Sequence, residues 1–264
     1  MSRRDVTMVL HGWLMLLGAL LAVTTGTVYA QNVIFDDFNS EELSSGKWTA
    51  QQVGNGGLEL VRQIVDGKLQ LAHRVVGART SNTGQNTSVN RLMMRKGGVT
   101  AVKFKVVVQE VDVRGCPEGD HSRVFVGFTG TLFTDDEDGD VGTFFFVERR
   151  SDSTDEEDIL RIKAGLFRCS GNNCSSFEDL GEIDLGTLAL GQSVTLRMIW
   201  EEASERVRFQ RDSEPKQTIR YNLTVDTRRD FRVFQIRGDA ANCESGPQPF
   251  AQMKANLDNI FINP

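Results

Sequence analysis

Apolar and polar side chains alternate along many short segments of this chain, and this pattern restricts it to β-structure. Apolar residues occupy every second position from Val102 to Val108 and again from Val194 to Trp200. Successive side chains of a strand point to opposite faces, so one face of each segment is expected to be buried and the other solvated. No segment after residue 30 shows a sustained helical period, and the sequence therefore predicts an all-β fold.

Turn-forming residues separate these segments, as at Asn55-Gly56-Gly57, Asp66-Gly67 and Asp138-Gly139. Further segments with the properties of strands are 58–65, 68–72, 123–133, 141–149, 159–169, 206–211, 218–221 and 231–236. Short strands separated regularly by turns are typical of a sandwich, and sandwiches of 200 to 250 residues often form one domain. We therefore expect a single two-sheet antiparallel jelly-roll domain over residues 31–264.

Residues 1–30 have the layout of a secretory signal peptide. Arg3 and Arg4 precede an apolar run over residues 13–23, and Val28-Tyr29-Ala30 forms a small-x-small cleavage site. The run is shorter than the roughly 20 residues that a membrane span needs, so we expect no membrane span after processing. The sequence predicts a secreted or periplasmic protein, and its formal net charge of −6 argues against a nucleic-acid partner.

The four cysteines all follow residue 30, where an oxidising compartment would favour disulfides. Four cysteines allow three connectivities. The preferred one pairs Cys169 with Cys174 across a short Ser-Gly-Asn-Asn segment, which leaves Cys116 to pair with Cys243.

Both ends of the expected domain carry motifs that point to one family. Phe35-Asp36-Asp37-Phe38-Asn39, Gly46-Lys47-Trp48 and Asp66-Gly67-Lys68-Leu69 occur in order near the start, and Leu257-Asp258-Asn259-Ile260-Phe261-Ile262 occurs near the end. These segments resemble the opening and closing strands of concanavalin A-like lectin/glucanase domains, particularly family 16 glycoside hydrolases. The resemblance implies a concanavalin A-like sandwich.

The hydrolases of that family place their carboxylates as Glu-x-Asp-x-Glu on one strand, where alternation directs all of them to the same face. The segment that corresponds by order, 142–148, offers Glu148 alone. Glu182-Ile183-Asp184-Leu185-Gly186 is similar by letter but has Gly186 in place of the second Glu. We therefore expect no catalytic set, and Glu182, Asp184 and Glu148 are the residues that a divergent hydrolase would use.

The resemblance also implies a structural calcium where the chain ends meet. The matching residues are Asp37 and Asp258, although calcium needs six to eight oxygen ligands, so backbone groups would have to contribute. The alternative is that both aspartates cap strand ends. The acidic segment 135–140 resembles a calcium loop but lacks the glutamate that completes one.

Basic residues on the solvated positions of later strands form a second candidate site. They are Arg161, Lys163, Arg197, Arg206, Arg208 and Arg220. Such a stripe could bind uronate or sulfate groups, with Arg197, Arg208 and the ring of Tyr221 as ligand-binding residues. The alternative is that these residues form cross-strand ion pairs with Glu148, Glu201 and Asp212.

The sequence therefore favours an exported, non-catalytic sandwich that binds a glycan, such as a cell-envelope polysaccharide, or another extracellular surface. Two alternatives remain open. One is a divergent polysaccharide hydrolase, and the other is a structural envelope protein without a small ligand.

Overall fold

The computed structural model describes residues 33–80, 84–133, 140–170, 176–222 and 229–263. All of them belong to one compact unit, Gln31–Pro264. The predicted signal peptide, residues 1–30, lies outside the described residues. Among the described residues, no helix is long and apolar enough to cross a membrane.

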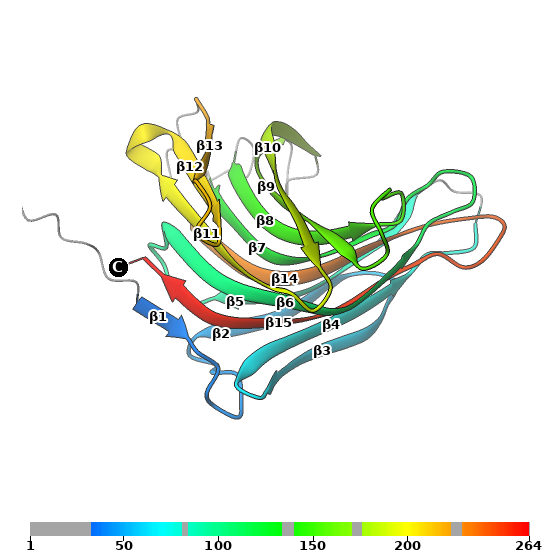
Figure 1. Cartoon of the computed structure of the whole chain (residues 1–264), viewed down its shortest axis with the longest axis horizontal. Helices are drawn as coiled ribbons and strands as arrows, with labels where there is room; N and C mark the ends of the chain where they lie inside the picture. Colours follow the sequence, from blue (N-terminus) through cyan, green and yellow to red (C-terminus); the bar gives the residue numbers. More distant parts are fainter. Residues whose placement is uncertain (1–32, 81–83, 134–139, 171–175, 223–228, 264) are drawn as a thin grey trace, which may run out of the picture. The chain divides into compact units, whose positions relative to one another are not determined.

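Two antiparallel sheets account for the strands of the described residues (Figure 1). Sheet A has the order β13(Gln217–Arg220), β12(Arg206–Arg211), β11(Ser193–Glu201), β6(Ala101–Arg114), β15(Phe250–Ile262), β4(Lys68–Val76), β3(Gly57–Val65), with β1(Val33–Asp36) also paired to β15. Sheet B has the order β10(Ser176–Ala189), β9(Ile159–Ser170), β8(Val141–Arg150), β7(Arg123–Phe133), β14(Arg229–Ala241), β5(Gln85–Met94), β2(Trp48–Gly54). A three-residue 3-10 helix, η2(Glu202–Ser204), connects β11 to β12. The predicted all-β sandwich of two antiparallel sheets is confirmed.

The two ends of the domain meet in sheet A. Val33 pairs with Ile262 and Ile34 with Phe261, so the first strand is hydrogen-bonded to the last. The next strand along the chain, β2, belongs to the other sheet. The opening motif and the closing motif are therefore joined by backbone hydrogen bonds, although they lie at opposite ends of the domain's sequence.

A buried row of aromatic rings lies between the sheets. Phe104 of sheet A contacts Phe234 and Phe145 of sheet B, with ring centroids 5.0 and 6.5 Å apart. Phe145 contacts Phe209 of sheet A at 5.5 Å. All four rings are at most 1% exposed. Aromatic pairs at these separations add to the free energy gained from burial, so this row joins the two sheets.

The opening motif has a clear structural role. The carboxylate of Asp36 is buried, accepts a 2.6 Å hydrogen bond from the indole nitrogen of Trp48 and lies 3.3 Å from the Lys47 ammonium. The Trp48 ring packs edge-on against Phe35 at 5.0 Å and against Phe234 at 6.0 Å. Asp36 thus satisfies the polar end of a core tryptophan, which explains the pairing of the Asp-Asp-Phe and Lys-Trp segments.

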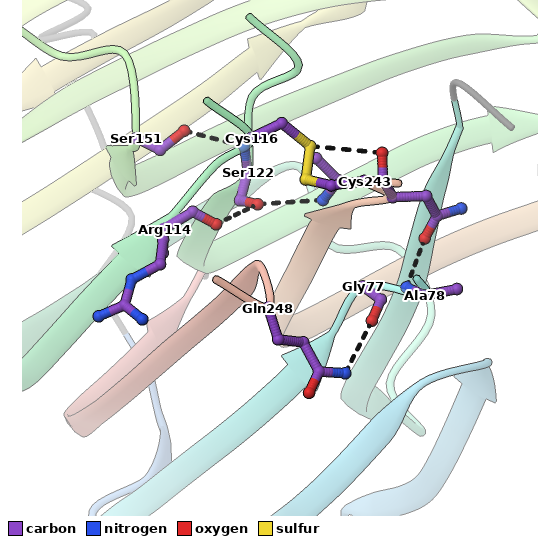
Figure 2. The surroundings of a disulfide bond; sticks show 10 residues. Gly77, Ala78, Arg114, Cys116, Ser122, Ser151, Cys243 and Gln248 are labelled. Carbon is purple, nitrogen blue, oxygen red and sulfur yellow. Dashed lines mark hydrogen bonds between the residues drawn. A yellow bond between two sulfur atoms is a disulfide. The ribbon is translucent and has the colours of Figure 1, made fainter. Parts of the chain in front are cut away.

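Cys116 and Cys243 form a disulfide across 127 residues of sequence, as predicted. Figure 2 shows its surroundings, where the Ser122 hydroxyl donates to the carbonyl of Arg114 and accepts from the backbone of Ala241. The disulfide therefore ties the β6–β7 connection to the segment after β14. Cys169 is also disulfide-bonded. Cys174 lies outside the described residues, so its pairing with Cys169 stays a prediction.

One histidine is enclosed by the sandwich. His73 on β4 is 1% exposed, and its Nδ1 lies 2.8 Å from the carbonyl of Glu59. A carbonyl can only accept, so Nδ1 carries the proton in the neutral ring. Burial lowers the pKa of His73 below its ordinary value of 6.5, because the charged ring would lose its hydration.

This burial predicts a stability that depends on pH in the range below 6.5. The folded-state pKa is lowered, so the unfolded chain takes up the proton first and the free energy of unfolding decreases as pH falls below 6.5. We expect His73→Asn, which keeps a donor near the Glu59 carbonyl, to reduce the slope of the free energy of unfolding against pH. The reduction should be at most about 1.4 kcal/mol per pH unit. Urea titrations across the window measure it, with the exposed His121→Asn as control. An unchanged slope in His73→Asn would contradict the assignment.

Candidate functional site

The outer face of sheet B carries a strip of aromatic side chains. On β8, Val141, Phe145 and Val147 point into the core, so Phe144 and Phe146 point outward and are half-buried. The Phe146 ring stacks on Phe125 of β7 with centroids 4.1 Å apart, and on Phe144 at 5.1 Å. We call Phe125, Phe146 and Phe144 the aromatic strip.

Glycines on neighbouring strands leave room for two phenylalanine rings, Phe144 of the aromatic strip and Phe167 of β9. A Cβ atom on Gly165 of β9 would lie 2.5 Å from the Phe144 ring, and one on Gly142 of β8 would lie 2.0 Å from the ring of Phe167. Both distances are too short for any side chain. The rings of Phe144 and Phe167 therefore lie across the neighbouring strands, and the sequence keeps these two positions free.

A cleft lined by charged residues lies on the same face of sheet B. Its volume is about 380 Å³, and its lining residues come from the ends of β7 to β10 and from the β8–β9 loop. The charged residues that line this charged cleft are Arg123, Glu148, Arg149, Arg150, Asp152, Asp155, Arg161, Lys163, Glu182 and Asp184. Acidic and basic groups are equally numerous in this set, so the cleft attracts neither sign of charge strongly.

Ion pairs between neighbouring strands fix the floor of the cleft. The Lys163 ammonium of β9 lies 2.9 Å from Glu182 and 3.3 Å from Asp184, both on β10. Arg161 donates two 2.6 Å hydrogen bonds to Asp155 and lies 3.3 Å from Asp184. Burial alone would raise the pKa of Asp184. Backbone donation from Gly186 and the positive charges of Lys163 and Arg161 outweigh this effect and lower the pKa, so the Asp184 carboxylate stays ionised.

Arg149 holds the β8–β9 loop that forms one wall of the cleft. Its guanidinium donates to the carbonyls of Glu156 at 2.8 Å, Ile159 at 2.7 Å and Asp155 at 3.1 Å. Arg150 makes a bidentate pair with Asp152, with both contacts at 2.9 Å. The loop is therefore anchored by charge-assisted hydrogen bonds, so the cleft is preformed.

Glu148 differs from the other carboxylates of the cleft. It is half-buried on the outer face of β8, opposite Phe125 on one side and Arg161 on the other. Within the described part of the chain its carboxylate makes no hydrogen bond or ion pair. Burial raises the pKa of Glu148, and the nearby Glu182 carboxylate adds to this, while the positive charges of Arg123 and Arg150 oppose it.

The structure places the predicted catalytic candidates together but divides the predicted basic stripe. Glu148, Glu182 and Asp184 all line the charged cleft. Arg161 and Lys163 lie there too, in ion pairs, whereas Arg197 and Arg208 belong to sheet A. A single stripe is therefore wrong, because its members occupy the outer faces of two different sheets.

The structure places Tyr221 in the core. It is 7% exposed, and its hydroxyl accepts a 2.7 Å hydrogen bond from the indole nitrogen of Trp200. Its ring packs edge-on against Trp200 at 6.1 Å. Tyr221 therefore offers no open face for stacking on a ligand.

The two aspartates of the predicted calcium site have different surroundings. Asp37 accepts hydrogen bonds from the backbone and side-chain amides of Asn39, at 3.3 and 2.9 Å, and these lower its pKa. Asp258 is half-buried on β15, opposite Lys105 of β6. Among the described residues no group of three or more acidic, histidine or cysteine side chains is arranged so that it could hold a metal ion. Residues 135–139 of the acidic segment 135–140 lie outside the described residues, and calcium binding stays a prediction.

The sequence did not lead us to predict functional roles for Arg123, Arg149 and Arg150, which line the charged cleft. It also did not lead us to predict one for Phe125 of the aromatic strip. The available signal was the Arg149-Arg150 pair directly before the acidic segment 152–158, because a strand end followed by opposite charges favours a salt-bridged loop.

Comparisons with known proteins return similar structures only. No family model matches the chain, and no curated protein matches it. LamAcat from Zobellia galactanivorans is 11% identical with a TM-score of 0.49, covering 87% of this chain and 96% of that one. A Bacillus licheniformis β-glucanase is 12% identical with a TM-score of 0.40, covering 86% and 95%. The carbohydrate recognition domain of Emp47p is 11% identical with a TM-score of 0.41, covering 86% and 94%.

Identities this low describe a likeness of fold alone. With TM-scores below 0.5, the activities of those proteins are not carried over to this chain, and the resemblance to concanavalin A-like lectin and glucanase domains stays a prediction.

The environment of Glu148 predicts opposite responses to two substitutions. Arg150→Gln removes a positive charge and should raise the pKa of Glu148, whereas Glu182→Gln removes a negative charge and should lower it. Carboxyl-carbon NMR titrations measure both shifts against the unaltered protein. Movement of the two variants in the same direction would contradict the arrangement of charges described above.

Proposed function

We propose that this protein is exported and binds a glycan, without hydrolysing it, on the outer face of sheet B. The observation that carries the proposal is the charged cleft beside the aromatic strip. Its volume of about 380 Å³ is within the usual range for small-ligand sites, which is roughly 300 to 1,000 Å³. Export is supported by the signal-like residues 1–30 together with the Cys116–Cys243 disulfide.

The chemistry of the cleft suits a neutral, hydroxyl-rich ligand. Ionised carboxylates accept hydrogen bonds, and guanidinium or ammonium groups donate them. A neighbouring pair such as Lys163 and Glu182 can therefore both donate to a sugar hydroxyl and accept from it. Their mutual ion pairs hold them in place before the ligand arrives, which reduces the entropy lost on binding. The balanced charge favours such a ligand over a polyanion.

Phe144 and Phe146 of the aromatic strip would contact the apolar face of a sugar ring, with the buried Phe125 supporting Phe146 from below. Phe144 and Phe146 are half-buried, so the rest of each ring remains accessible beside the cleft. Aromatic rings supply a large apolar contact area at low conformational cost. A glycan chain lying across β8 and β9 would place one sugar in the cleft and the next on the strip.

We expect Lys163→Gln and Phe146→Ala each to weaken glycan binding about tenfold, equivalent to about 1.4 kcal/mol. A glycan array identifies the ligand, and calorimetry then compares the variants. Lys254→Gln is the matched control, because it removes an exposed lysine that pairs with Glu110 on sheet A. Arrays with and without chelator test the calcium proposed at Asp37 and Asp258. Equal binding by wild type and both cleft variants, or no retained glycan, would refute the proposal.

Hydrolysis by the same cleft is the second candidate, and Glu148 is the observation that favours it. A carboxyl whose pKa is raised by burial can stay protonated and act as general acid, while the neighbouring Asp184 stays ionised. Against this, both Glu182 and Asp184 share the Lys163 ammonium, so neither is free to serve as a nucleophile or base.

We therefore expect no release of reducing ends when the retained glycan is incubated with the protein. The assay is repeated with Glu148→Gln and over a range of pH. Release that disappears in Glu148→Gln, and that declines as pH rises through the pKa of Glu148, would establish the hydrolase instead.

A further inference from the structure

The outer face of sheet A carries a row of basic side chains that the charged cleft does not use. Alternation places Phe104, Leu196 and Phe209 in the core, so the residues between them point outward. We give the name basic band to six outward-facing basic residues of β6, β11, β12 and β13, which are Lys103, Lys105, Arg197, Arg206, Arg208 and Arg220.

Strand register makes the band continuous. Lys105 lies opposite Thr195, two residues from Arg197, and Arg208 lies opposite Ile199, again two residues from Arg197. Arg208 lies opposite Thr218, two residues from Arg220. Each step thus moves one strand across and two residues along, and such diagonal neighbours are about 7–8 Å apart. Three steps give a line of positive charge roughly 20 Å long across four strands.

Like charges also face each other directly within the band. Lys103 is opposite Arg197, and Arg206 is opposite Arg220. Directly opposed like charges destabilise a sheet. Within the described part of the chain, Lys105, Arg197 and Arg220 make no ion pair or side-chain hydrogen bond that would offset this repulsion.

Few carboxylates neutralise the band. Glu201 on β11 pairs with Arg206 and lies 3.1 Å from Arg208, and Asp258 lies opposite Lys105 at one end. Lys103 is held over the Phe261 ring, 4.0 Å from its centroid. The band therefore keeps a clear positive excess on a protein whose formal net charge is −6.

We propose that the basic band binds a linear polysaccharide that carries sulfate or carboxylate groups. Arginine side chains bind both groups through paired hydrogen bonds, and evenly spaced cations match the repeating charges of such a polymer. The net negative charge of the protein disfavours a broad anionic surface such as a membrane, which would meet more of the molecule than one line. This surface is separate from the charged cleft and does not depend on the function proposed for it.

Binding of the mature protein to dextran sulfate and to polygalacturonate, with unmodified dextran as the neutral polymer, tests the proposal. We expect retention on one or both anionic polymers and none on dextran. Retention should be lost between ionic strengths of about 0.15 M and 1 M, because the Debye length shortens from about 8 to 3 Å. The double variant Arg197→Gln/Arg208→Gln should bind at least tenfold more weakly.

Two controls separate this surface from the rest of the protein's charge and from unfolding. Arg91→Gln/Arg168→Gln removes the same number of positive charges from sheet B, outside the charged cleft, and should leave polyanion binding unchanged. Melting temperatures verify that all variants fold, and Arg197→Lys/Arg208→Lys should restore part of the affinity. Equal retention of the band variant and wild type, equal binding to dextran, no binding to either anionic polymer, or stronger binding to phosphatidylserine vesicles would each overturn the proposal.

Discussion

Burial of one face of each sheet against the other is the interaction on which the rest of this structure depends. Phe104 and Phe209 of sheet A interlock with Phe145 and Phe234 of sheet B, and these rings are at most 1% exposed. A slip of one residue in any of these strands would move its apolar side chains to the solvent. The aromatic row therefore fixes the register, and the register decides which side chains reach each outer surface.

The two outer surfaces that result have different chemistry. Sheet B presents a balanced set of charges next to phenyl rings, with Glu182 and Asp184 of β10 matched to Lys163 and Arg161 of β9. Sheet A presents cations opposite cations, as at Lys103 and Arg197. The same alternation that builds one core thus separates a surface suited to hydroxyl groups from a surface suited to anions.

Local patterns in the sequence were sufficient to predict the sandwich, the strand character of most segments and the Cys116–Cys243 pair. The three phenylalanines at 144–146 show a feature that the local pattern does not predict, namely which ring enters the core. Only the middle ring, Phe145, enters the core, while its neighbours form the aromatic strip. The basic residues could not be divided between sheets from the sequence, because sheet membership depends on pairing between distant strands such as β6 and β11. Tyr221 was misplaced for the same reason, since its partner Trp200 lies on another strand.

The disulfide has a consequence for the order in which the domain is completed. Cys243 follows β14, so the crosslink can form only after the chain has been synthesised through β14. Once formed, it holds the β6–β7 connection, where the backbone of Ser122 exchanges hydrogen bonds with the hydroxyl and backbone of Ser151. Ser151 begins the loop that carries Asp152 and Asp155 into the charged cleft. Oxidation of two cysteines far from β10 therefore adds a covalent restraint next to the loop that Arg149 anchors through the carbonyls of Asp155, Glu156 and Ile159.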